Sequence, residues 1–141
     1  MKFWDSSAVI ALLAHEATRS WLLELLEQDA QVLIWWGTTV EIASALARRE
    51  REQLLTADEV SSAMLLARQL TESWHEITPS DAVRRTAERL LRMHPLRAAD
   101  SLQLAAALVA ADHDPANLPL VCLDARLSSA ARREGFTVLT V

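Results

Sequence analysis

Short runs of apolar residues alternate along this chain with longer segments in which apolar residues recur at helical spacing. The clearest short run is VLIWW at residues 32–36, which is apolar throughout and is followed by Gly37. Runs without an alternating polar face are typical of parallel strands that helices cover on both faces. The pattern predicts five strands, at residues 2–4, 32–36, 75–77, 120–123 and 137–141.

Helices are predicted between these strands, because apolar residues there recur at intervals of three and four. The expected ranges are residues 6–13, 18–28, 39–52, 57–73, 79–93, a segment around Asp100 that ends near 112–115, and 125–134, with Gly135 as a stop. Three helix starts carry the capping-box pattern of a Thr followed three residues later by an acid. The pairs are Thr38 with Glu41, Thr56 with Glu59 and Thr78 with Asp81.

The alternation of strands and helices predicts an α/β fold, a parallel sheet of about five strands with helices on both faces. At 141 residues the chain is expected to form one domain, residues 1–141. Trp4 and Trp35 lie in predicted strands and are expected in the core, whereas Trp21 and Trp36 are better candidates for an edge or an interface.

The composition is that of an ordinary soluble globular protein, with 51% apolar and 23% charged residues. No apolar run reaches the roughly 18 residues that a membrane span needs, and no cleavable leader is evident. The single cysteine, Cys122, excludes an internal disulfide and a Cys-x-x-Cys metal motif, and the four histidines show no zinc-ligand spacing. We expect a cytoplasmic protein with no membrane association.

The net charge of −5 argues against loose binding to nucleic acid. All but one of the 14 basic residues are arginines, however, and they cluster along the chain. The clusters are Arg48, Arg49 and Arg51; Arg84, Arg85, Arg89 and Arg92; and Arg126, Arg132 and Arg133. Each cluster is either a solvated helix face with Arg–Glu pairs or a local strip that binds phosphates. The sequence leaves both readings open.

One helix carries a carboxylate where its sequence otherwise predicts burial. The stretch LRAADSLQLAAAL, residues 96–108, is apolar around most of its circumference, yet Asp100 lies inside it. An acid near a helix start is favoured by the helix dipole. That effect does not explain a carboxylate on a helix that otherwise belongs in the core, so Asp100 is a candidate functional residue.

Three further acids are expected beside Asp100. Asp5 follows the first predicted strand, Asp124 follows the strand at 120–123, and Glu41 lies in the first turn after VLIWW. Each of these acids, taken alone, is explained by helix capping. Because the carboxyl ends of parallel strands form the edge where ligands bind, all four are expected at one edge of the sheet.

Carboxylates gathered at such an edge repel one another and raise one another's pKa. A hard divalent cation relieves this repulsion, and Mg²⁺ prefers carboxylate and water oxygens. A cation held this way activates water and neutralises phosphate, which is the chemistry of phosphodiester hydrolysis. The four acids therefore point to a metal-dependent nuclease.

The same segments resemble a known family, the PIN-domain ribonucleases of the VapC toxin type, which are the toxins of bacterial type II toxin–antitoxin pairs. The matching pieces follow one another in the family's order and cover essentially the whole chain. They are WDSSAVIALL around Asp5, TTVEIASALAR around Glu41, LRAADSLQLAAAL around Asp100 and CLDARLSSAARREGF around Asp124.

This resemblance implies a Rossmann-like PIN domain in which Asp5, Glu41, Asp100 and Asp124 surround Mg²⁺ or Mn²⁺. Asp124 matches the most variable of the four positions and is expected to act through water. Ser7 matches a hydroxyl residue that often hydrogen-bonds near the metal, although helix capping explains it equally well. The resemblance further implies cleavage of RNA by a metal-oriented water, a homodimer, and a VapB-like antitoxin whose tail covers the active-site groove.

Other phosphoryl-transfer classes lack their motifs here. A haloacid-dehalogenase-like phosphatase needs Asp-x-Asp after the first strand, but Asp5 is followed by Ser6 and Ser7. A phospho-receiver domain needs a late lysine, and Lys2 is the only lysine. Glycine-rich nucleotide motifs are absent. One alternative from another class stays open, a non-catalytic module whose acidic pocket binds a basic partner peptide.

Overall fold

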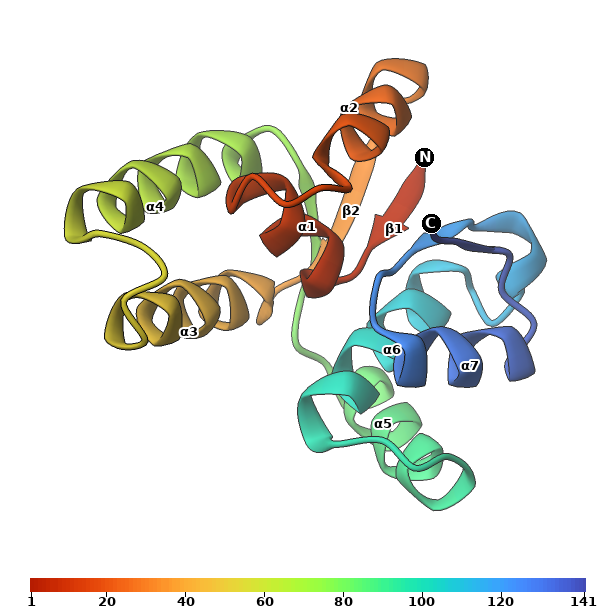
Figure 1. The fold of residues 1–141 in the computed structure, drawn as a ribbon. Helices are drawn as coiled ribbons and strands as arrows, with labels where there is room; N and C mark the ends of the chain where they lie inside the picture. The colour runs from red at the N-terminus through yellow and green to blue at the C-terminus, as the bar shows by residue number, and fades with distance from the viewer.

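In the computed structural model, which describes residues 1–141, five parallel strands form one sheet in the order β3-β2-β1-β4-β5 (Figure 1). The strands are β1 (Lys2–Trp4), β2 (Val32–Trp35), β3 (His75–Ile77), β4 (Leu120–Val121) and β5 (Val138–Leu139). The first strand in the chain is thus central in the sheet, where Phe3 is in register with Leu33 on one side and Leu120 on the other.

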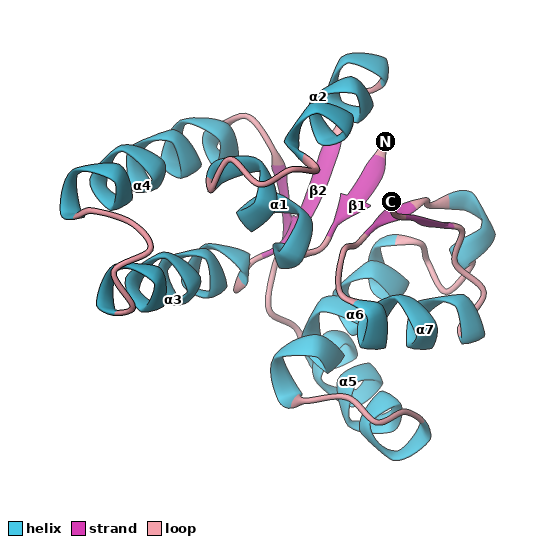
Figure 2. Ribbon diagram, in the orientation of Figure 1, coloured by secondary structure: helices cyan, strands magenta, loops and turns pink.

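Helices cover both faces of this sheet, as the sequence predicts (Figure 2). The first four helices pack on one face and the last three on the other. Their bounds are α1 (Ser6–Leu13), α2 (Arg19–Gln28), α3 (Thr38–Arg51), α4 (Ala57–Glu72), α5 (Asp81–Met93), α6 (Ala98–Ala110) and α7 (Ala125–Arg133), with a short 3-10 turn at Pro115–Asn117. The predicted α/β fold is confirmed.

Two separate hydrophobic cores explain why the central strands are largely apolar. Phe3 faces the core beneath α5, α6 and α7, whereas the next residue, Trp4, faces the core beneath α1 to α4. Successive side chains of a strand point to opposite faces, so a strand with two covered faces needs apolar residues at every position. Trp4 and Trp35 are buried as expected, and Trp36 is 52% exposed.

The helix starts agree with the sequence patterns at one position and differ at two. Thr56 and Glu59 form the predicted capping box at α4, with both hydrogen bonds at 3.1 Å. The prediction for α3 is wrong, because Thr38 is the first helical residue and its hydroxyl is buried against another side chain. The prediction for α5 is also wrong, since Ser80 rather than Thr78 caps that helix.

Both glycines occupy positions that a side chain would disturb. A Cβ atom at Gly37 would lie 2.5 Å from the indole Nε1 of Trp35, so the turn after β2 leaves room only for glycine unless Trp35 moves. Gly135 has a φ of +102° at the end of α7, in the region that favours glycine, which confirms the predicted stop. None of the helices combines the length and the apolar character that crossing a membrane requires.

Candidate active site

The four acids selected from the sequence all lie at the carboxyl edge of the three central strands. Asp5 follows β1 and is the N-cap residue of α1, and Asp124 follows β4 and is the N-cap residue of α7. Glu41 is in the first turn of α3, which follows β2, and Asp100 is in the first turn of α6, which packs against β2. The topology therefore places on one edge residues that are far apart in the chain.

Asp5 is the most buried of these acids, with 2% of its surface exposed. Its Oδ2 atom accepts hydrogen bonds from the Ser7 backbone N–H at 3.0 Å and from the Ser7 hydroxyl, and the Cys122 thiol donates to it at 3.6 Å. Burial raises the pKa of Asp5, and the charge of Asp124 adds to this effect. The hydrogen bonds from Ser7 and Cys122 oppose the rise without cancelling it.

Glu41 is half-buried and its carboxylate is held at both oxygens. Ser6 donates its hydroxyl to Oε1 at 3.1 Å, and Gln103 donates its amide Nε2 to Oε2 at 2.6 Å. Burial raises the pKa of Glu41, and the charges of Asp5 and Asp100 raise it further. Asp5 and Glu41 thus form a pair of interacting carboxylates that both resist ionisation.

Asp100 and Asp124 make local contacts at the starts of their own helices. Asp100 Oδ2 accepts from the Arg97 backbone N–H at 3.2 Å, and Asp124 Oδ1 accepts from the Leu127 backbone N–H at 2.7 Å. No group of three or more His, Cys, Asp or Glu side chains is placed to hold a metal ion in this conformation. The four acids share an edge of the sheet, but their joint ligation of one ion stays a prediction.

Sequence reasoning missed Gln103, a residue of α6 that contacts the start of α3, where Glu41 lies. Its side chain is 1% exposed, and its Nε2 also donates to the Thr38 hydroxyl at 3.0 Å. Gln103 therefore fixes α6 to the start of α3 and orients Glu41. The available signal was its position three residues after Asp100, which places both polar residues on one face of an otherwise apolar helix.

Two small side chains fix Asp5 in place. The Ser7 hydroxyl accepts from the Leu123 backbone N–H at 2.9 Å while it donates to Asp5, so it joins the loops after β1 and β4. Burial raises the pKa of the Cys122 thiol to about 12, and the charge of Asp5 adds to the rise. The thiol therefore stays protonated at neutral pH.

The donor chemistry at this edge fits a hard divalent cation. No arginine, lysine or histidine forms an ion pair with any of the four acids. All donors to Asp5 and Glu41 are neutral groups, so no basic side chain of the protein compensates the negative charge that the pair carries when ionised. Carboxylate oxygens in this state are the ligands that Mg²⁺ and Mn²⁺ prefer.

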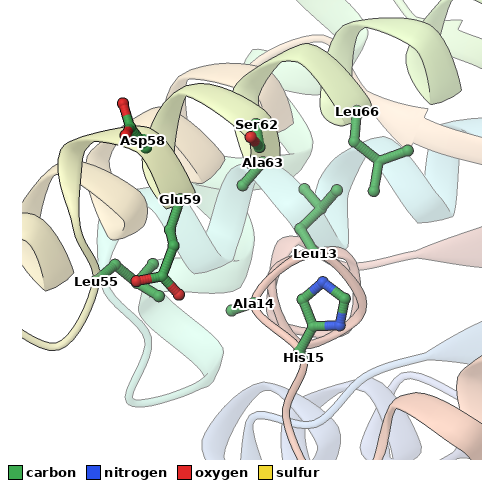
Figure 3. Close-up of a pocket in the computed structure, with 9 residues that line it drawn as sticks. All are labelled: Leu13, Ala14, His15, Leu55, Asp58, Glu59, Ser62, Ala63 and Leu66. Atoms are coloured by element: carbon green, nitrogen blue, oxygen red, sulfur yellow. The ribbon is translucent and has the colours of Figure 1, made fainter.

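A distinct apolar pocket of about 430 Å³ lies away from these acids, between the end of α1 and α4 (Figure 3). Leu13, Leu55 and Leu66 supply apolar walls, and Asp58 and Glu59 stand at one end. None of the four candidate acids lines it. Its lining suits an apolar ligand or peptide, with two carboxylates for a basic group at one end, rather than a phosphate.

The raised pKa of Asp5 predicts a stabilising substitution. Folded Asp5 keeps its proton at pH values where the unfolded residue, with an ordinary pKa of 3.8, has lost it. The free energy of unfolding of the metal-free protein therefore falls as the pH rises through the folded pKa. Asp5→Asn keeps a capping oxygen and removes this loss, so it should stabilise the metal-free protein near pH 8 by on the order of 1 kcal/mol.

Thermal unfolding in EDTA between pH 4 and pH 8, a range that starts near the ordinary pKa of 3.8, measures this effect. The advantage of Asp5→Asn over the parent should grow with pH and reach a rise in Tm of about 2–4 °C. Glu88→Gln, an exposed position on α5 without polar contacts, is the control and should show no such trend. An Asp5→Asn variant less stable than the parent at pH 8 would show that the carboxylate is not strained by its burial.

Three solved structures have the same fold over nearly the whole chain. A toxin–antitoxin complex from Klebsiella pneumoniae aligns with a TM-score of 0.69 and 17% identity, covering 99% of this chain and 97% of that chain. VapBC2 from Rickettsia felis, bound to a DNA fragment from its promoter, aligns with a TM-score of 0.66 and 12% identity, covering 99% of this chain and 97% of that chain. PAE2754 from Pyrobaculum aerophilum aligns with a TM-score of 0.64 and 22% identity, covering 99% of this chain and 83% of that chain.

Comparison of the sequence itself found no match: no family model matches the chain, and no curated protein matches it. The similarity to the three structures therefore lies in the fold. It confirms the Rossmann-like α/β architecture that the resemblance to PIN domains implies, including the parallel sheet with helices on both faces.

Proposed function

We propose that this chain is a Mg²⁺-dependent endoribonuclease and acts in the cytoplasm as the toxin of a toxin–antitoxin pair. The observation that carries the proposal is the Asp5–Glu41 pair, two carboxylates with raised pKa values and no basic partner at the edge of the central strands. The motif resemblance and the fold shared with toxin–antitoxin structures support the same function.

The cation would be held by Asp5 and Glu41, with Asp100 and Asp124 completing the acidic set. When bound, Mg²⁺ or Mn²⁺ supplies positive charge beside a phosphate and lowers the pKa of a water for in-line attack. Ser7 and Gln103 position the two buried carboxylates through the hydrogen bonds described above. Such contacts to metal ligands typically determine ligand orientation and affinity. No side-chain nucleophile is required.

Cleavage of a mixed pool of structured RNAs by the purified chain tests this function. Cutting should require Mg²⁺ or Mn²⁺, stop in EDTA, and fall by about 100-fold or more in Asp5→Asn and Asp100→Asn, a loss typical for groups that stabilise developing charge. Glu88→Gln, which lies outside the acidic edge, should cut like the parent. Sequencing of the product ends then identifies the RNA target.

Other outcomes of the same experiment contradict the proposal. Cleavage that survives in both Asp variants would place the activity elsewhere or in a contaminant. If the parent itself cuts no RNA but binds an Arg-rich peptide that Asp5→Asn does not bind, the chain is the non-catalytic, peptide-binding module instead.

The partners that we propose are an antitoxin and a second copy of the chain. The apolar pocket between α1 and α4, with Asp58 and Glu59 at its end, suits an antitoxin segment that presents apolar and basic side chains. Exposed apolar residues on other elements, among them Trp36 at 52% and Val40 at 65%, supply surface for contact between two copies. The resemblance to VapC toxins supports both partners.

Sedimentation equilibrium of the purified chain, freed of any partner, tests the homodimer. The measured mass should be twice that of the chain, and a monomer at micromolar concentration would contradict the dimer. For the antitoxin, RNA cleavage should be absent while a co-purified partner is bound and should appear once it has been removed. Equal activity with and without that partner would contradict an inhibitory role.

A further inference from the structure

A small basic pocket lies between α7 and the turn that joins α5 to α6, outside the acidic site. It has a volume of about 190 Å³, and three of the residues that line it carry basic side chains. The lining residues are His94, Pro95, Arg126, Ser129, Ala130 and Arg133. The chain as a whole has a net charge of −5, so the overall charge of the protein does not account for three basic side chains in one small pocket.

The two arginines of this pocket are not neutralised by the protein. Neither Arg126 nor Arg133 forms an ion pair or a side-chain hydrogen bond, although Arg89 nearby is paired with Glu134 through two contacts of 3.2 and 3.1 Å. Arg126 and Arg133 are seven residues apart on α7 and therefore lie on the same face, about two turns from each other. Guanidinium groups are suited to bidentate binding of phosphate oxygens.

His94 adds a buried polar atom that has no partner. Its Nε2 lies 2.7 Å from Glu134 Oε1. Burial alone would raise the pKa of Glu134, but hydrogen bonds from Arg89 and His94 lower it, so Glu134 is ionised and Nε2 donates. The other ring nitrogen, Nδ1, is buried and makes no hydrogen bond. A buried polar atom left unpaired is costly. Because the ring proton is on Nε2, Nδ1 of the neutral ring is an acceptor, so a hydroxyl group of the ligand, rather than an unprotonated phosphate oxygen, would relieve that cost.

The pocket borders the edge of the sheet that carries the acids. Arg126 is in the first turn of α7, two residues after Asp124, and Pro95 precedes α6, which carries Asp100 in its first turn. Helices α5, α6 and α7 lie together on one side of the molecule (Figure 1). A strand whose phosphate occupies the pocket can therefore continue toward the acidic edge.

We propose that this pocket binds a phosphate group and that its natural occupant is a backbone phosphate of the RNA, next to the phosphate that is cleaved. Arg126 and Arg133 supply charge and paired N–H donors, and the Ser129 hydroxyl supplies a neutral donor. This assignment to RNA rests on the proposed ribonuclease function. The binding of phosphate itself depends only on the basic pocket.

Two measurements on the full chain separate these claims. The first follows the His94 ring signals by NMR, with ¹⁵N-histidine labelling, during titration with inorganic phosphate at constant ionic strength. The second follows the fluorescence anisotropy of a labelled single-stranded RNA in EDTA, where no cleavage is needed. Both compare the parent, the double variant Arg126→Gln/Arg133→Gln and the control Arg132→Gln, an exposed arginine of α7 that does not line the pocket.

We expect phosphate to shift the His94 signals in the parent and in Arg132→Gln but not in the double variant. RNA binding should weaken about tenfold in the double variant, and the slope of log K against log salt should fall by about 0.7, the value for one phosphate contact on a single strand. The Arg132→Gln variant should stay within about twofold of the parent.

The alternative results are equally informative. If phosphate leaves the His94 signals unchanged in the parent, and the double variant binds RNA like Arg132→Gln, the proposal is overturned. In a third outcome, phosphate shifts the His94 signals in the parent but not in the double variant, while the double variant binds RNA as tightly as Arg132→Gln does. This outcome overturns the assignment to RNA and leaves a site for free phosphate. RNA binding that depends on the two arginines in a protein that cuts no RNA supports the pocket and rejects the ribonuclease.

Discussion

The burial of the Asp5 carboxylate at the end of the central strand is the constraint on which the rest of the structure depends. Its backbone N–H donates to the Val121 carbonyl at 3.0 Å, and its side chain caps α1. The same residue thus extends the contact between β1 and β4 and begins the first helix. Asp5 cannot turn toward solvent without losing the cap, so its carboxylate is held among neutral donors with Glu41 in electrostatic range.

The burial of these two carboxylates lowers the stability of the folded protein. Asparagine caps a helix as well as aspartate does and carries no charge to desolvate. Stability therefore does not explain why the chain has two buried, interacting acids without a basic partner, whereas the divalent cation that we propose would explain it. The arginines are found elsewhere: Arg89 neutralises Glu134, and Arg126 and Arg133 remain available at the neighbouring pocket. Separate acidic and basic sites at one edge suit a polyanionic substrate that needs a cation at one phosphate and direct contacts at another.

Much of the fold was predictable from the sequence because the central strand β2 is buried on both faces, which leaves the unbroken apolar run VLIWW. The capping pattern was less reliable, since it describes local bonding only. At Thr38 the hydroxyl instead receives a hydrogen bond from Gln103, 65 residues away in the chain. The four acids could be placed at one edge from topology, but their side-chain contacts could not. Gln103 and the pocket at His94 escaped prediction because both depend on packing between distant helices.

The most direct test of the account is to locate a cation on the protein itself. Crystals grown without chelator and soaked in Mn²⁺ would be measured at a wavelength where manganese scatters anomalously. The account predicts an anomalous peak within about 2.5 Å of carboxylate oxygens of both Asp5 and Glu41, a distance that carboxylate ligation of such ions permits. Full occupancy of Mn²⁺ at another position, with none between these two residues, would contradict it and leave their burial without a function.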